Sequence, residues 1–164
     1  MIMKLIAHRG NIDGPSDRQN EPDYIDNALS LGYDAEIDAR YDPLTTKFWL
    51  GHDEPQYSVS WKWMANRHEL LWIHCKDITT LNEFTKWEHG GYQYFWHQQD
   101  DFALTSNKYI WTYPGKPYTP RSIIVMPEKT MAVDDLRDLR AVNCYGICTD
   151  FVAEISDYVV EEVV

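Results

Sequence analysis

The chain has 164 residues, 44% of them hydrophobic, and a formal net charge of -11. This length suits one domain over residues 1–164 with a core of its own, and the composition excludes a disordered chain. Because affinity for nucleic acids and anionic bilayers comes mostly from clustered Lys and Arg, the acidic balance argues against both kinds of partner.

No integral membrane segment is expected, because no uninterrupted apolar run is long enough to span a bilayer. The residues before His8 are too few for a signal peptide and contain no small-residue cleavage site. Cys75, Cys144 and Cys148 are an odd number without a second metal-ligand pair. They are expected to be buried reduced thiols, with a disulfide as the minor alternative, which favours a cytoplasmic location.

The first third of the chain contains three short apolar runs, expected to be strands, that each end in polar or charged residues. These runs and the residues that follow them are 4–7 with His8-Arg9, 33–35 with Glu36 and Asp38, and 48–50 with His52-Asp53. A helix is expected from Pro22 to Gly32, after a turn-rich loop over residues 11–20. The polar turn at residues 42–47 leaves two arrangements open, because the second and third strands can form a hairpin or lie side by side.

Later segments alternate between strand and helix patterns. Strands are expected at 70–76, 92–97, 109–113, 122–126 and 145–148, and helices at 60–70, 77–87 and 133–139. Asp77 is expected to cap the second of these helices, because its carboxylate can accept hydrogen bonds from the N–H groups of the first turn. This alternation predicts an α/β fold with a mainly parallel sheet.

A strand that stops abruptly at a polar group is typical of a parallel barrel strand where it reaches the face that holds active sites. We therefore expect a compact or shortened TIM-like (βα) barrel with some helices missing, because a complete barrel usually takes about 200 residues or more. A Pro- and Gly-rich loop at residues 114–120 stands where a helix would be expected. The sequence therefore leaves open whether the barrel closes.

Two histidines, two carboxylates and an arginine would meet at the mouth of such a barrel. The unperturbed pKa of imidazole is about 6.5, so His8 and His52 can act as general acid or base near neutral pH. Glu36 and Asp38 are separated by one residue, which places both carboxylates on the same face of a strand. Taken singly, each of these side chains has an ordinary structural role, and only the combination indicates a catalytic site.

In order and spacing these residues resemble the glycerophosphodiester phosphodiesterases and their TIM-barrel relatives, which include the venom phospholipase D enzymes. The shared motifs are His8-Arg9-Gly10, Asn20-Glu21-Pro22, Glu36-Ile37-Asp38, His52-Asp53, Lys76 and the last strand at residues 146–150. The resemblance is good through Lys76, thin after it, and returns at the last strand. It implies metal-assisted hydrolysis of a glycerophosphodiester or related small phosphodiester, or intramolecular transfer to a cyclic phosphate.

The resemblance also implies a role for each candidate side chain outside the metal site. His8 and His52 would be the general acid and base, and Arg9 and Lys76 would supply positive charge to the phosphate. Trp111 resembles an aromatic residue that walls the substrate pocket in some relatives, although a core or rim position accounts for it at least as well.

Glu36, Asp38 and Glu21 would hold the divalent cation, for which Mg²⁺ or Ca²⁺ is expected. One departure from the family pattern concerns a third metal carboxylate, since His74 occupies that position here. Imidazole suits Zn²⁺ or Mn²⁺ better than Ca²⁺. Three alternatives follow: a changed metal preference with His74 as a ligand, a cation held by the three carboxylates and water, or loss of metal binding.

Two alternatives to a self-contained enzyme are also consistent with the sequence. The chain could be a catalytically inactive module that keeps the anion pocket for a phosphorylated ligand, which the short length and His74 both permit. Alternatively, a partner subunit, such as a second copy in a homo-oligomer, could replace the missing barrel wall.

Overall fold

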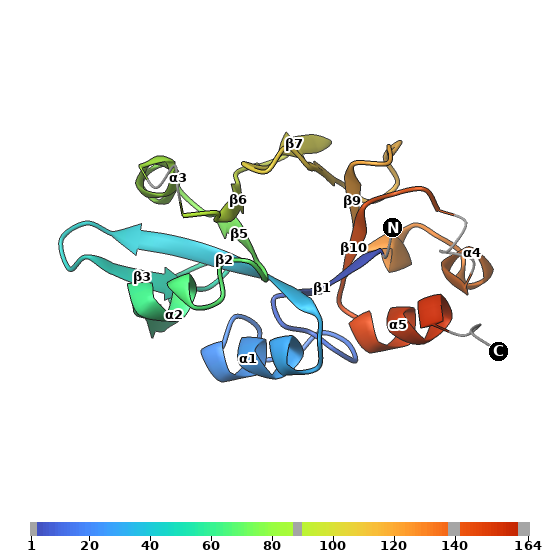
Figure 1. The fold of residues 1–164 in the computed structure, drawn as a ribbon, viewed down its shortest axis with the longest axis horizontal. Coiled ribbons are helices and arrows are strands. Elements are labelled where there is room, and N and C mark those ends of the chain that lie inside the picture. Colours follow the sequence, from blue (N-terminus) through green and yellow to red (C-terminus); the bar gives the residue numbers. More distant parts are fainter. Residues whose placement is uncertain (1–2, 87–89, 138–141, 161–164) are drawn as a thin grey trace.

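The protein is described by a computed structural model that covers residues 3–86, 90–137 and 142–160. Its strands curl around a central axis, and its helices lie outside them (Figure 1). The strands are β1 (Lys4–His8), β2 (Asp34–Asp42), β3 (Lys47–Leu50), β4 (Tyr57–Val59), β5 (Leu71–Cys75), β6 (Gln93–Phe95), β7 (Phe102–Leu104), β8 (Ile110–Thr112), β9 (Ser122–Val125) and β10 (Gly146–Thr149). The helices are α1 (Pro22–Ser30), α2 (Trp61–Ala65), α3 (Ile78–Thr85), α4 (Val133–Arg137) and α5 (Val152–Val160), with a 3₁₀ turn η1 (Pro127–Lys129).

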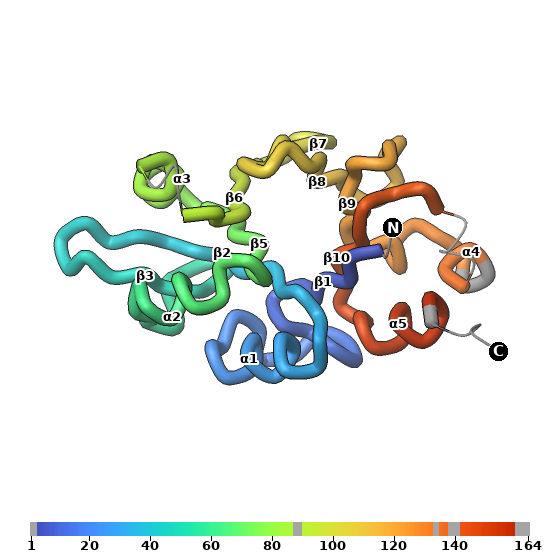
Figure 2. Tube along the Cα trace, viewed as in Figure 1, coloured from blue at the N-terminus to red at the C-terminus, as the bar shows by residue number. Residues whose placement is uncertain are grey.

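The curled wall follows the strand order β6-β5-β2-β1-β10-β9-β8-β7. Every pair from β6 to β8 is parallel, whereas β7 is antiparallel to β8. The first and last strands lie side by side (Figure 2), with Ile6 in register with Cys148. The strands β3 and β4 continue from β2 as an antiparallel ribbon, so the polar turn at residues 42–47 closes a hairpin.

The wall is a mixed and open sheet, so the complete TIM-barrel architecture is not reached. Among the described residues, no hydrogen-bonded ladder joins the edge strands β6 and β7. Ser106 connects these two edges, because its backbone N–H donates to the Tyr94 carbonyl at 2.8 Å. The described helices also leave the outer face of β7 and β8 without a cover (Figure 1). The expected α/β fold with a shortened barrel therefore holds, but closure is incomplete because hairpins replace some of the βα units.

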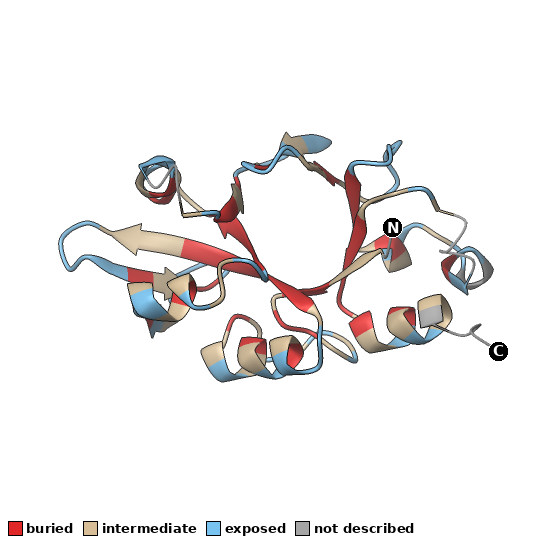
Figure 3. Cartoon of the chain, in the orientation of Figure 1, coloured by how far each residue is buried: buried red, intermediate tan, exposed pale blue. Residues whose placement is uncertain are grey.

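Alternation along β2 separates the inside of the wall from its outside. Ala35, Ile37 and Ala39 pack with the helices outside the sheet, whereas Glu36 and Asp38 point to the inside. This arrangement follows from the two-residue period of a strand. Figure 3 shows that the buried residues follow the central strands of the wall.

The inside of the wall is filled by side chains and forms a core of its own. Its buried members are Ile6, Trp72, Phe95, Trp111, Ile123, Val125 and Cys148. They come from β1, β5, β6, β8, β9 and β10, which are distant in sequence. This apolar layer closes the interior beneath the polar strand ends, so those ends form the floor of a mouth and not a channel.

Most of the strands and helices expected from the sequence are present with slightly different bounds, but the helix expected at 60–70 ends at Ala65. Asp77 caps α3 as predicted, since its carboxylate accepts the Thr80 N–H at 2.7 Å. The expected helix ends at Trp87 and Leu139 lie outside the described residues. The strands β4 and β7 and the helix α5 were not predicted from the sequence. The helix α5 packs on the sheet through residues such as Ile155.

The three cysteines are free thiols, and Cys75 and Cys148 are buried, as expected. In the part of the chain that the structure describes, no helix has the length and apolar character needed to cross a membrane.

Candidate active site

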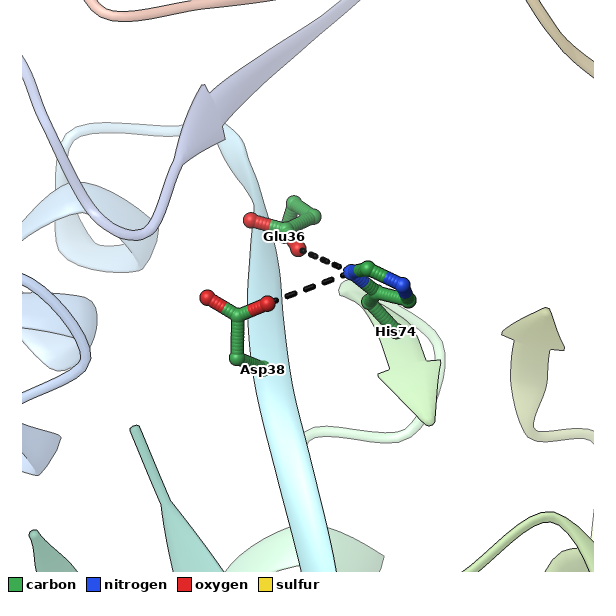
Figure 4. A group of neighbouring side chains, drawn as sticks. All are labelled: Glu36, Asp38 and His74. Atoms are coloured by element: carbon green, nitrogen blue, oxygen red, sulfur yellow. Dashed lines mark hydrogen bonds and ion pairs between the residues drawn. The ribbon is translucent and has the colours of Figure 1, made fainter. Parts of the chain in front are cut away.

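The centre of the site is formed by two neighbouring parallel strands, β2 and β5. Asp38 is in register with His74, and Glu36 lies two residues earlier on the same face of β2. All three side chains are buried, with exposed fractions of 0%, 8% and 2% for Asp38, His74 and Glu36. One ligand atom from each lies within 4.8 Å of the others, and His74 Nδ1 points toward both carboxylates (Figure 4).

Asp38 is surrounded by positive charge and hydrogen-bond donors. Its Oδ2 lies 2.9 Å from Arg9 Nε and 2.9 Å from Asn20 Nδ2. Its Oδ1 lies 3.3 Å from Lys76 Nζ and 3.1 Å from His74 Nδ1. Burial alone would raise the pKa of Asp38, but the His74 hydrogen bond and the two cations outweigh it, so the pKa falls well below its usual range.

Glu36 is much less well compensated than Asp38. Its Oε2 accepts the Arg9 backbone N–H at 3.2 Å, and His8 Nε2 lies 3.9 Å from the same oxygen. Burial and the nearby Asp38 charge both raise the pKa of Glu36, against weaker opposing effects of His8 and Arg9. The site therefore contains a buried carboxylate whose negative charge would be stabilised by an additional cation.

The loop between β1 and α1 holds the cationic side of the site in an unusual backbone conformation. Arg9 and Asn20 both have left-handed φ angles, of 54° and 65°, which are uncommon for residues other than glycine. Gly10 follows at φ 83°, and a Cβ there would lie only 2.9 Å from the Ile25 side chain. Asn20 joins this loop to β2, because its side chain donates to Asp38 Oδ2 and accepts the Asp38 backbone N–H at 2.9 Å. Such a conformation is maintained only where the surrounding contacts fix it.

His8 is buried at the end of β1 and is held by the last strand segment of the wall. Its Nδ1 lies 2.6 Å from Asp150 Oδ1, and the same oxygen accepts Asn11 Nδ2 at 2.7 Å. Burial would raise the pKa of Asp150, but the His8 and Asn11 hydrogen bonds lower it overall. This pair fixes the ring and leaves Nε2 directed toward Glu36, 3.9 Å from its Oε2.

His52 lies on the loop after β3 and is much more exposed than His8. Its Nδ1 lies 2.7 Å from the exposed Asp53 carboxylate, and Arg40 Nη2 donates to its carbonyl at 2.8 Å. Burial lowers the pKa of His52, and the nearby Arg9 charge lowers it further. His52 and Arg9 line one cleft of about 240 Å³, together with Ser16, Asp17, Gln19, Asn20, Asp53, Glu54 and Gln56.

Two of the predicted site residues are not part of this group. Glu21 precedes α1, and its carboxylate pairs with Arg18 Nε at 2.5 Å instead of approaching Glu36 or Asp38 in the described cluster. Trp111 is 3% exposed and stacks on Phe95, with ring centroids 4.4 Å apart, in the core inside the wall. It does not line the cleft. The sequence alone allowed a core position for Trp111 as readily as a pocket wall, and its packing supports the core position.

Three residues beside the site, Asp150, Asn20 and His97, have contacts that the sequence did not predict. Asp150 belongs to the last family motif without an assigned role, and its contact with His8 spans 142 positions of sequence. Asn20 lies inside one of the family motifs, but the sequence predicted no role for its side chain. His97 stacks on His74, with ring centroids 4.5 Å apart, and burial lowers its pKa to about 4. The available signal was the position of His97 at the end of an expected strand and of Asp150 just after one.

The donor set of the site fits a divalent cation. Two carboxylates and one imidazole can each supply one ligand atom from a buried position. Arg9 and Lys76 provide positive charge beside them, and two histidines lie at hydrogen-bonding reach of neighbouring carboxylates. The chemistry that this arrangement can support is proton transfer next to an anionic group whose charge is neutralised.

No family model and no curated protein matches the chain. Among solved structures, the fold is similar to the crystal structure of a "putative glycerophosphoryl diester phosphodiesterase" from Silicibacter pomeroyi DSS-3, with a TM-score of 0.52. The two chains share 10% sequence identity, and the match covers 98% of this chain and 94% of the other. The similarity concerns the fold, and at that level it confirms the resemblance that the sequence motifs predicted.

Proposed function

We propose that the protein cleaves a small phosphodiester, of the glycerophosphodiester class, at the mouth of the curled sheet. The reaction is hydrolysis or transfer of the phosphoryl group to a substrate hydroxyl, with His8 and His52 as acid and base and a divalent cation as cofactor. The observation that carries this proposal is the buried group of Glu36, Asp38 and His74, with its ligand atoms within 4.8 Å of one another. It stands in a fold that matches the Silicibacter protein over 98% of this chain.

The two histidines have environments that suit different roles. His52 is half-exposed at the polar cleft, and its lowered pKa keeps the ring neutral near pH 7, as a general base requires. His8 is buried and paired with Asp150, whose carboxylate stabilises an imidazolium that can donate a proton from Nε2. We therefore assign His52 to the attacking hydroxyl and His8 to the leaving alkoxide.

The negative charge of the phosphate would be neutralised by side chains that already converge on Asp38. Arg9 offers its guanidinium nitrogens at the cleft, and Lys76 supplies a point charge from the end of β5. Glu36, Asp38 and His74 would hold the cation, which supplies Lewis-acid stabilisation of the phosphoryl oxygens when it is bound. We propose Glu21 as a further cation ligand only if its carboxylate leaves Arg18 and approaches Glu36 and Asp38.

The test is turnover of bis(p-nitrophenyl) phosphate by the parent protein and by His8→Ala and His52→Ala, each with and without a chelator. Loss of a general acid or base should lower kcat by about a hundredfold or more. His68→Ala is the matched control, because the His68 ring lies outside the site and hydrogen-bonds the Ala65 carbonyl. Equal rates in the parent protein and in both active-site variants would contradict the catalytic assignment.

A second candidate function is favoured by His74, which stands in place of a metal carboxylate and is already within 3.1 Å of Asp38. Arg9 and Lys76 would stay beside Asp38 whether or not a cation is bound. A module that binds a phosphorylated ligand without cleaving it would retain this arrangement. Inorganic phosphate or glycerol 3-phosphate would then raise the melting temperature while no chelator-sensitive turnover is measured.

A cytoplasmic location and a homo-oligomeric state stay predictions from the sequence.

A further inference from the structure

Contacts at both ring nitrogens orient the imidazole of His74. Its Nδ1 lies 3.1 Å from Asp38 Oδ1 and 3.9 Å from Glu36 Oε1. Its Nε2 lies 3.4 Å from the carbonyl oxygen of His97. Phe95 and His97 stack against the ring, with 5.1 Å and 4.5 Å between centroids and interplanar angles of 5°.

This arrangement is the one that metal-binding histidines adopt in proteins. A ligating imidazole donates its second N–H to a backbone carbonyl or carboxylate, which fixes the tautomer and directs the other nitrogen at the metal. When no cation is bound, Nδ1–H can donate to Asp38 Oδ1 at 3.1 Å. The His97 carbonyl lies 3.4 Å from Nε2, so a ring that keeps its proton on Nε2 would present Nδ1 to a cation between Asp38 and Glu36. The cation would then take the place of the Nδ1 proton.

The distances from His74 Nδ1 to the two carboxylates permit a small cation, and the choice among cations rests on the nitrogen ligand. Tetrahedral bonds of about 2.0–2.2 Å separate two ligand atoms by about 3.3–3.6 Å, and the two His74 distances of 3.1 and 3.9 Å bracket that range. Ca²⁺ takes about six to eight oxygen ligands, and Mg²⁺ retains an oxygen shell with several waters. Imidazole with carboxylates instead suits the divalent transition metals.

We propose that Glu36, Asp38 and His74 bind a transition-metal dication, Mn²⁺ or Zn²⁺, in preference to Mg²⁺ and Ca²⁺, and that His74 is the ligand that sets this preference. The inference rests on the cation site of the proposed function, but it concerns binding and not turnover. Of the three alternatives that the sequence leaves open, it selects the changed metal preference with His74 as a ligand. It also gives the ring stack of Phe95 and His97 a role as support for the ligand.

The test is metal binding by the chelator-stripped protein, measured by isothermal titration calorimetry with Mn²⁺, Zn²⁺, Mg²⁺ and Ca²⁺ in turn. Mn²⁺ and Zn²⁺ should bind at least about tenfold more tightly than Mg²⁺ and Ca²⁺. Co²⁺ serves as a spectroscopic probe, and its visible absorption bands should report nitrogen ligation in the parent protein. Mg²⁺ or Ca²⁺ binding as tightly as Mn²⁺ and Zn²⁺ would overturn the proposal, as would no binding of any of the four ions.

Two substitutions at one position separate ligand chemistry from folding. His74→Glu supplies an oxygen ligand and should reverse the preference toward Mg²⁺ or Ca²⁺, whereas His74→Asn keeps the size near Nδ1 and should weaken Mn²⁺ and Zn²⁺ binding by about tenfold or more. His68→Asn is the control and should bind all four ions as the parent does. A preference for Mn²⁺ or Zn²⁺ that survives in a folded His74→Asn variant would overturn the assignment of His74.

The binding experiment is independent of the proposed function. Turnover that is unaffected by His8→Ala and His52→Ala contradicts the catalytic roles while leaving the metal preference standing. A protein that cleaves the diester but binds Mg²⁺ most tightly contradicts the metal preference while leaving the catalytic roles standing.

Discussion

Glu36 and Asp38 point to the same interior from one strand, yet their surroundings shift their pKa values in opposite directions. Asp38 contacts Arg9, Lys76 and His74, and its pKa is lowered. Glu36 is compensated only weakly by His8 and Arg9, and burial raises its pKa. At neutral pH one carboxylate therefore stabilises the fold and the other destabilises it, which is typical of side chains retained for function.

Glu36→Gln is expected to raise the free energy of unfolding at pH 7 by about 1–3 kcal/mol, because it removes a poorly compensated buried charge. A carboxyl with a raised pKa in the folded state costs stability only above its pKa in the unfolded chain, about 4.3. The advantage of the variant should therefore be present at pH 7 and disappear below about pH 4. Urea unfolding at both pH values measures it.

Asp38→Asn is the matched substitution with the opposite expected sign. It should lower the free energy of unfolding at pH 7 by about 3–5 kcal/mol, because Arg9 and Lys76 would keep their charges without a buried partner. Since the pKa of Asp38 is lowered on folding, its contribution is present above about pH 3.9 and is lost as the pH falls below that value. Similar changes in the two variants at pH 7 would contradict the assigned pKa directions.

Asp150→Ala is expected to lower kcat by at least about tenfold with a smaller change in KM, because the buried carboxylate orients His8 and stabilises its imidazolium. The pH–rate profile should also shift on the limb that reports the acid. Asp53→Ala is the comparison, since Asp53 makes the corresponding contact with His52 from an exposed position, where an ion pair contributes little. An equal loss in both variants would contradict a specific positioning role for Asp150.

At the scale of elements, polar side chains at strand and helix ends determine how the segments join. Asp77 begins α3 and also connects it to β2, because Thr80 donates to Asp77 through its hydroxyl and accepts the Tyr41 N–H at 2.6 Å. On the other side of the site, Asn20 joins the β1–α1 loop to β2 through two hydrogen bonds with Asp38. β2 is therefore fixed at Asp38 within the site and again three residues later at Tyr41.

Asp77→Ala is expected to lower the free energy of unfolding by about 1–2 kcal/mol, because α3 loses its N-terminal cap. Asp77→Asn should lose less, since an amide oxygen can still accept the Thr80 N–H. Chemical denaturation of the two variants and the parent at pH 7 measures the difference. If Asp77→Asn lowers the free energy of unfolding as much as Asp77→Ala does, the stabilising feature is the charge of Asp77 and not its hydrogen bond.

At the scale of the whole molecule, the two edges of the wall meet without a regular ladder. Ser106 makes this contact, because its hydroxyl donates to the Tyr92 carbonyl at 2.8 Å and accepts the Tyr94 N–H at 3.0 Å. The nearby outer face of β7 and β8 carries exposed Phe102 and Leu104, which no helix of the described chain covers. The wall is therefore weakest between β6 and β7.

Ser106→Ala is expected to speed amide hydrogen exchange at Tyr94 by about tenfold, which corresponds to the loss of about 1.4 kcal/mol of local protection. Exchange in β1 and β10 should be unchanged, because these strands lie in the middle of the sheet. Ser58→Ala on the exposed edge strand β4 is the control. Unchanged exchange at Tyr94 would indicate that the edges are held by other contacts.

The local patterns of the sequence were sufficient to predict most of the strand and helix segments, the cap at Asp77 and the face shared by Glu36 and Asp38. These features depend on residues close together in the chain, such as the two-residue period of β2 and the turn formers around α1. The polar strand ends and the chain length also predicted a shortened barrel, and the mixed, open sheet is consistent with it.

Other features depend on contacts between segments that are far apart in sequence, and only the tertiary structure decided them. The pairing of His8 with Asp150 requires β1 and β10 to be neighbours, and the pairing of Glu21 with Arg18 instead of the acidic centre depends on how one loop folds. The position of Trp111 in the core, and the open edge between β6 and β7, follow from how the strands curl. Sequence periodicity gives the face of each strand, but the identity of its neighbours is fixed by the packing of the whole sheet.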